Sequence, residues 1–204
     1  MNSFKFYADA ALTTAVSART IAHFVTGATD PQDFVFYYGS TESGTKVGAE
    51  SNPGVDQIIV SIANGTQVWT AATAKVVNDK VRTTAKNGYR YKVQSITSGG
   101  LTGASEPTWP TTIGATVVDN QVTWINDGKI HESTEIKLAL SNAGLTSAIA
   151  GASLSIGTVI NSGSANAVPV HLRIDDATAI VGTASELSIA TVSTHEIPVG
   201  ETWP

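Results

Sequence analysis

Apolar and polar residues alternate with a period of two along most of this chain, which is typical of β-strands. The run 34–39 carries apolar or aromatic residues on both of its alternating faces, which indicates the central strand of a sheet. Further alternating runs, each with one apolar face, cover 57–62, 135–140, 168–174 and 186–192. The alanine-rich stretch 8–20 has no helical stripe or cap, so the pattern predicts an all-β protein.

Turn-forming residues separate these runs. Pro, Gly, Asn or Asp cluster at 30–31, 51–54, 142–144 and 161–164. Proline fixes φ where a turn begins, and Gly or Asn adopts the positive φ that a tight reversal needs. Short strands joined by such turns indicate an antiparallel β-sandwich of the Ig-like kind.

A separate strand pattern occupies the middle of the chain. Tyr91 and Val93 alternate with polar residues, the stretch 106–110 reads Glu-Pro-Thr-Trp-Pro, and 121–125 alternates again. On either side, 56–65 and 134–144 have one common form, an alternating strand that ends in Asn and Gly.

We therefore predict a discontinuous β-sandwich host domain, residues 1–65 and 130–204, with a small β-module inserted at 66–129. The alternative is a single sandwich with one long, decorated hairpin.

The composition is poor in charge. Charged residues make up 14% of the chain, against about 25% in a typical globular protein. The surface of a chain with so few charged residues either consists of Ser, Thr, Asn, Gln and Gly or is buried against other proteins. The net charge of −5 argues against a nucleic-acid partner. Lys75, Lys80 and Arg82 form the nearest thing to a basic cluster, and we interpret them as a solvated strand face.

Several site chemistries are excluded or disfavoured. The chain has no cysteine, which excludes disulfides, thiolate metal sites and cysteine nucleophiles. The first seven residues do not form a signal peptide, and no apolar run approaches the roughly 18 residues of a membrane span. We expect synthesis in the cytoplasm and no membrane partner.

Catalytic and metal-binding motifs are not recognisable either. Neither a Gly-x-Ser-x-Gly elbow nor a phosphate-binding glycine loop occurs. The histidines 23, 131, 171 and 195 lack metal-ligand spacing, and neighbours such as His131 and Glu132 point to opposite faces of a strand. We predict no enzymatic activity, no cofactor and no metal. A metal site built from distant residues and a glycosidase carboxylate pair stay open as alternatives.

The aromatic residues allow two interpretations. Trp69, Trp109 and Trp124, with two tyrosines, either fill the core of the module or form a platform on which sugar rings stack. The core interpretation is favoured, and in the platform interpretation Tyr91 and Trp109 contact the glycan. Trp203 is the penultimate residue, and we predict that it docks on a neighbouring subunit.

The segments 30–40, 51–58 and 151–157 resemble virion structural proteins of tailed bacteriophages. So does the block 89–124, in which a Glu-Pro-x-Trp-Pro turn precedes a Val-Thr-Trp strand. The resemblance implies a non-enzymatic protein of the virion, made in the bacterial cytoplasm.

Its implied role is that of a capsid decoration (cement) protein, bound to the major capsid protein or to copies of itself. A tail, neck or baseplate protein and a module that binds cell-surface glycans are the alternatives. The resemblance transfers no functional residue.

Overall fold

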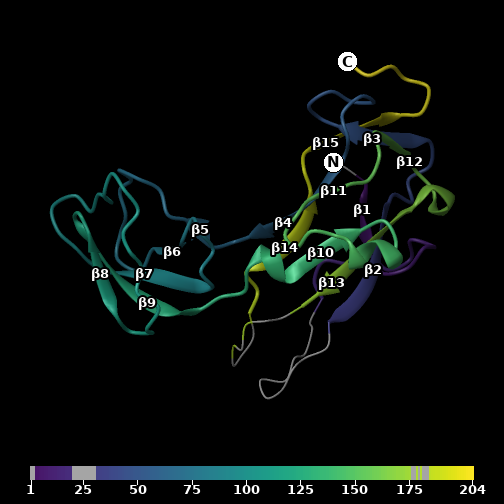
Figure 1. Cartoon of the computed structure of the whole chain (residues 1–204). Helices are drawn as coiled ribbons and strands as arrows, with labels where there is room; N and C mark the ends of the chain where they lie inside the picture. Colours follow the sequence, from purple (N-terminus) through teal and green to yellow (C-terminus); the bar gives the residue numbers. More distant parts are fainter. Residues whose placement is uncertain (1–2, 20–30, 176–177, 179, 181–183) are drawn as a thin grey trace. The chain divides into compact units, whose positions relative to one another are not determined.

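A computed structural model describes residues 3–19, 31–175, 178, 180 and 184–204 of the chain. These residues form strands and three short 3₁₀ helices, which confirms the prediction of an all-β, antiparallel sandwich fold (Figure 1). They divide into two compact units. The first is drawn from 1–63, 133–177 and 189–204, and the second from 64–132 and 178–188.

The first unit contains a four-stranded antiparallel sheet in the order β1-β2-β13-β10. Its strands are β1 (Lys5–Tyr7), β2 (Gln32–Gly39), β13 (Val168–Ile174) and β10 (Ile136–Ala139). The prediction that 34–39 is central is confirmed, because β2 pairs with a strand on each side. Tyr38 is 1% exposed and contacts the rings of Phe4 and Phe6. Aromatic packing therefore anchors the N-terminal strand to the centre of the sheet.

Two three-stranded sheets accompany it, in the orders β11-β4-β14 and β12-β3-β15. The strands are β3 (Thr45–Ala49), β4 (Ile59–Asn64), β11 (Leu154–Ser155), β12 (Val159–Asn161), β14 (Leu187–Thr191) and β15 (Thr194–Pro198). Val47 and Val60 are fully buried. The 3₁₀ helices are η1 (Ser133–Glu135), η2 (Ala143–Thr146) and η3 (Ser164–Asn166).

Some strand limits differ from those predicted. The run 135–140 places Leu140 on its buried face, but β10 ends at Ala139 and Leu140 is 49% exposed. The reason is the turn into η2, which ends the alternation one residue early. Strand β4 starts two residues later than the predicted run 57–62 and continues to Asn64.

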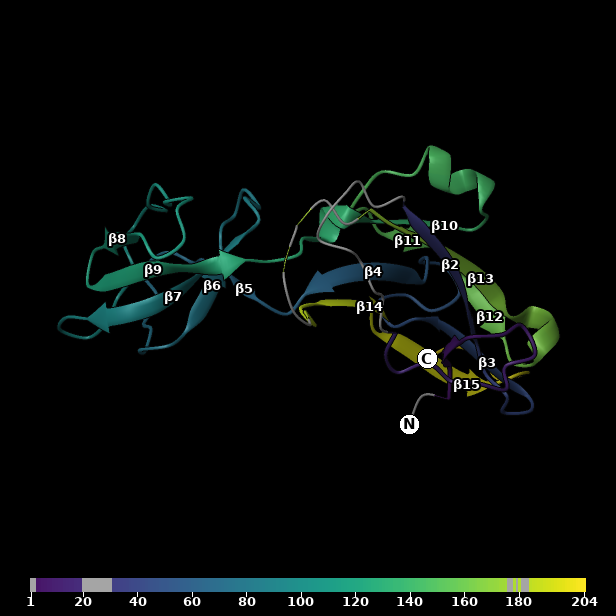
Figure 2. The ribbon, with the colours of Figure 1, turned by 90° about the horizontal axis from the view of Figure 1, so that it is seen from below.

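The second unit is a five-stranded sheet in the order β5-β6-β7-β9-β8. Its strands are β5 (Gln67–Val68), β6 (Lys80–Arg82), β7 (Tyr89–Ile96), β8 (Thr116–Asp119) and β9 (Val122–Lys129). The short β5–β6 pair is parallel and the other pairs are antiparallel. Strands β7 and β9 run side by side over most of their length (Figure 2).

Inward-facing residues of these strands form one apolar core. Its buried members are Trp69, Val81, Tyr91, Val93, Val122 and Trp124. This confirms the core interpretation for Trp69, Tyr91 and Trp124. All six come from 69–124, inside the predicted module, but the status of 66–129 as an independently folding insertion stays a prediction.

Candidate functional site

The predicted glycan platform is the first candidate, and it is largely internal. The ring centroid of Trp109 lies 4.2 Å from that of Tyr91 and 5.7 Å from that of Trp124. Tyr91 is fully buried, its hydroxyl donates to the Pro110 carbonyl at 3.0 Å, and burial raises its pKa. The alternative interpretation, in which Tyr91 stacks on a sugar, is therefore wrong, because its ring has no face open to a ligand.

Trp109 is half-buried beside this core. Its indole Nε1 donates to the Glu106 carboxylate at 2.8 Å, and the backbone N–H of Thr84 donates to the same oxygen at 3.0 Å. Burial raises the pKa of Glu106, but the hydrogen bonds from Thr84 and Trp109 outweigh it, and the pKa lies below its usual value. The Glu-Pro-Thr-Trp-Pro stretch is thus held in place by its own glutamate.

Asp119 is a residue whose role sequence reasoning missed. Asp119 is the last residue of β8, and Asn120, with φ +54°, lies in the turn that leads into β9. The Asp119 side chain, however, is 3% exposed and lies under the aromatic core. Its Oδ2 accepts hydrogen bonds from the indole Nε1 of Trp69 at 2.8 Å and of Trp124 at 3.1 Å.

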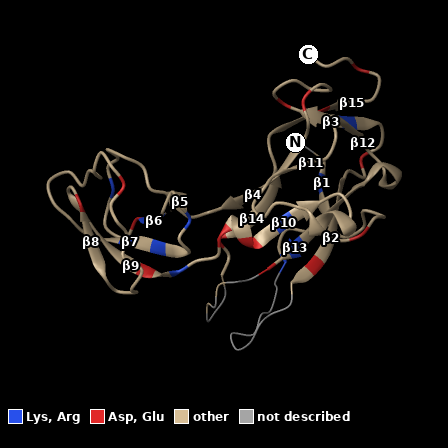
Figure 3. Cartoon of the chain, viewed as in Figure 1, with Lys and Arg blue, Asp and Glu red and all other residues tan. Residues whose placement is uncertain are grey.

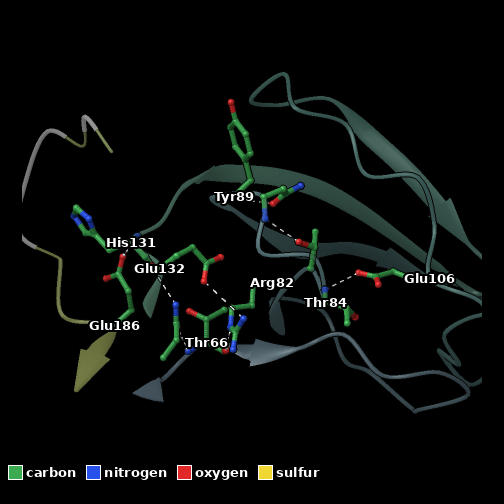
Figure 4. A network of polar contacts seen from close by, with 11 residues as sticks. Thr66, Arg82, Thr84, Tyr89, Glu106, His131, Glu132 and Glu186 are labelled. Carbon is green, nitrogen blue, oxygen red and sulfur yellow. Dashed lines mark hydrogen bonds and ion pairs between the residues drawn. The ribbon is translucent and has the colours of Figure 1, made fainter. Parts of the chain in front are cut away.

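A polar network ties together three passes of the chain at one end of the second unit (Figure 4). Arg82 Nη1 lies 3.7 Å from Glu132 Oε2, and Arg82 Nε donates to the Thr66 carbonyl at 3.2 Å. The backbone N–H of His131 donates to Glu186 Oε1 at 2.8 Å, and Gly65 N–H donates to the Glu186 carbonyl. These contacts make the network a structural clamp for the entering and leaving segments.

A basic cluster surrounds one carboxylate on the sheet of the second unit. We use this name for Lys80, Arg90 and Lys92, whose nitrogens lie 3.5, 3.0 and 3.2 Å from the oxygens of Asp127. Burial raises the pKa of Asp127, but the hydrogen bond from Lys92 and the charges of Arg90 and Lys80 together outweigh it, so the pKa lies below its usual value. Three strands, β6, β7 and β9, supply these four groups.

The first unit has a shallow depression of about 450 Å³. Its lining residues are Ser3, Glu42, Thr45, Thr194, His195, Glu196, Ile197 and Pro198. The Glu196 carboxylate accepts hydrogen bonds from the backbone N–H and the hydroxyl of Ser3. Burial raises the pKa of Glu196, and the bonds from Ser3 and Thr45 reverse the shift, so the pKa is lowered. This carboxylate is suited to fastening the N-terminal segment rather than to giving up a proton near neutral pH.

Trp203 lies on the first unit, beside β3 and β15. The Lys46 ammonium is 5.1 Å from its ring centroid, the His195 ring is 6.1 Å away, and a Cβ on Gly54 would come within 2.7 Å of its Nε1. The indole is half-buried on its own chain. Docking of the remaining indole surface on a neighbouring subunit stays a prediction.

Within the described ranges, His, Asp and Glu side chains form no group of three or more that could hold a metal ion. His23 lies outside those ranges. No helix among the described residues has the length and apolar character needed to cross a bilayer. Of the three aromatic residues expected to contact a partner, the structure brings Tyr91 and Trp109 together, whereas Trp203 belongs to the other unit.

Comparison with known proteins found no match: no family model, no curated protein and no solved structure matches the chain.

Proposed function

We propose that this chain is a non-enzymatic structural subunit of a tailed-phage particle, a decoration protein seated on the capsid. The observation that carries the proposal is the combination of low charge and exposed branched aliphatic side chains on both units. With 14% charged residues, large parts of the sheets present neutral surface. The resemblance of the sequence to phage virion proteins supports the proposal that this surface binds other proteins of a virion.

Exposed aliphatic residues gather at one end of the second unit. Val76 is 63% exposed, Ile96 39% and Leu101 40%. The segments that carry them meet, because Lys75 N–H donates to the Gly100 carbonyl, Ala74 bridges to Leu101, and Ile96 would contact a Cβ on Gly100. Exposed apolar groups that lie together, unlike single ones, are typical of surfaces that bind protein.

The mechanism is surface burial. A specific contact needs about 800 Å² per partner, and repetition over a lattice multiplies weak contacts into firm attachment. The partners are the major capsid protein and further copies of this chain. Location in the virion follows from the same proposal.

Glycan binding is a weaker candidate. The burial of Tyr91 leaves Trp109, itself half-buried, as the remaining ring of the expected pair. A single partly covered indole offers little area for stacking a sugar.

The test is to purify DNA-filled particles from an induced lysate of the bacterium whose genome carries this sequence. Heads and tails are separated, and peptides of the chain are quantified by mass spectrometry in each fraction. We expect the chain in heads, in numbers comparable to the major capsid protein. Recovery with tails would replace the decoration role by a tail role, and absence from purified particles would overturn the virion proposal.

A further inference from the structure

Charge is distributed unevenly along the chain. Residues 66–129 contain seven of the twelve Lys and Arg residues but four of the seventeen Asp and Glu residues. The rest of the chain therefore holds five basic and thirteen acidic residues, a net charge of −8 against +3 for the middle segment. In Figure 3 the ribbon is blue, for basic residues, on β6 and β7, and red, for acidic residues, in the loops about β3 and β15. The two regions are electrostatically complementary.

The basic cluster is the positively charged surface of the second unit. The side chains of Lys80, Arg90 and Lys92 are 47%, 29% and 34% exposed, whereas that of Asp127 is 17% exposed. One carboxylate faces three cations, so the cluster keeps a surplus of positive charge at the surface. The nearby Arg82 is not part of this surplus, because it lies beside Glu132 in the clamp.

The negative partner is a border of carboxylates around the β12-β3-β15 sheet. We call Glu42, Glu50, Asp56 and Glu201 the acidic border, and all four are exposed. Glu42 precedes β3, Glu50 and Asp56 follow it, and Glu201 follows β15. The Lys46 ammonium in this region donates to the Glu201 carbonyl at 2.7 Å and lies against Trp203.

We propose that the basic cluster of one copy docks on the acidic border of a second copy. The two surfaces differ, so the contact is head-to-tail, and repetition gives a closed ring or an extended array. Complementary charges at such a contact favour encounter and fix its register. The inference deepens the proposed function, on which it rests, by naming a second copy as a partner.

A free polyanion is a poorer occupant of the basic cluster. Asp127 sits between the three cations and would repel a phosphate placed there, whereas separate carboxylates can address the outer side of each cation. The whole chain is also negative, at −5, and repels a polyanion at long range.

The experiment measures self-association of the full chain by sedimentation velocity over a range of concentrations. We expect assembly in low salt and at least about a tenfold weaker association constant at 0.5 M salt, where charges are screened within about 4 Å. A chain that stays monomeric in low salt, or that associates equally at both salt concentrations, overturns the inference.

Charge-reversed variants then locate the contact. Lys80→Glu/Lys92→Glu and Glu50→Lys/Glu201→Lys each reverse one surface, and each is expected to lose self-association. Mixed in equal amounts they should regain association, because the two reversed surfaces attract each other and the unreversed basic cluster of one variant still attracts the unreversed acidic border of the other. Lys80→Gln/Lys92→Gln provides a milder variant should the first one fold poorly, and circular dichroism checks every fold. A mixture that stays monomeric overturns the assignment of the surfaces.

Two further results separate the alternatives. Inorganic polyphosphate that binds wild type but not Lys80→Gln/Lys92→Gln, with no self-association, would replace the second copy by a polyanion. Recovery of the chain in phage heads without salt-sensitive association would overturn this inference alone. Salt-sensitive association of a chain absent from particles would support the contact and overturn only the proposed function.

Discussion

At the scale of single residues, the Asp119 carboxylate joins three separate segments of the second unit. Its two oxygens accept from the indoles of Trp69 and Trp124 and from the backbone N–H of Gly103, the last at 2.7 Å. A Cβ on Gly103 would lie 2.5 Å from the carboxylate, so this approach requires glycine. Because buried donors are costly to leave unpaired, the carboxylate fixes the placement of both indoles.

We expect Asp119→Ala to destabilise the second unit by roughly 3 kcal/mol, because it leaves two buried indole N–H groups and the partly buried N–H of Gly103 without an acceptor. Urea unfolding followed by tryptophan fluorescence measures the effect, since three of the four tryptophans belong to this unit. Asp56→Asn, at an exposed position, is the control and should change little. Equal effects of the two substitutions would refute the anchoring role of Asp119.

At the scale of elements, Asp127 links the strands β6, β7 and β9 through the basic cluster. Its pKa is lowered in the folded protein, so Asp127 stabilises the fold above its unfolded pKa of about 3.9. This contribution is lost as the pH falls through the lower, folded pKa. The sheet of the second unit is therefore expected to weaken in acid.

Asp127→Asn should lower the melting temperature of the second unit by a few degrees at pH 7, because three cations then face one another without a counter-charge. The difference from wild type should shrink as the pH falls from about 4 to 2, where Asp127 itself becomes protonated. Thermal melts followed by tryptophan fluorescence give both curves. Asp33→Asn, which breaks the ion pair with Arg173 in the first unit, is the matched control. A difference that persists undiminished at pH 2 would contradict the assignment.

At the scale of the whole molecule, the chain divides into two compact units. The core of the second unit comes entirely from 69–124, and its clamp joins 64–66 to 131–132. Glu186 comes from a distant part of the sequence and joins the clamp by accepting hydrogen bonds from the backbone N–H groups of Gly65 and His131. Each unit thus has its own buried residues and its own surface to offer a partner.

We expect residues 64–132 to fold when expressed alone, with dispersed amide resonances in an NMR spectrum. Loss of the Glu186 contacts should make the fragment less stable than the same residues in the full chain, and a domain of this size is marginal to begin with. A full-length Glu186→Ala variant isolates that contribution. A collapsed, poorly dispersed spectrum of the fragment would refute the prediction of an inserted module.

The sequence by itself determined the fold class and several strands, because period-two alternation and turn residues are local signals. The stripe 168–174 coincides with β13, and the aromatic residues of 69–124 formed the core that their spacing favoured. The short strands β1, β3 and β15 escaped notice, since three to five residues carry too little pattern.

Tertiary structure alone decided how distant side chains meet. The sequence allowed Tyr91 as a sugar contact, but the fold buries its ring. No local pattern showed that the Asp119 carboxylate accepts hydrogen bonds from two indoles. Lys80, Arg90 and Lys92 are scattered along the sequence and gather on Asp127 only through the pairing of β6, β7 and β9. Burial and charge proximity depend on strand register across the sheet, and no local stretch of sequence contains that information.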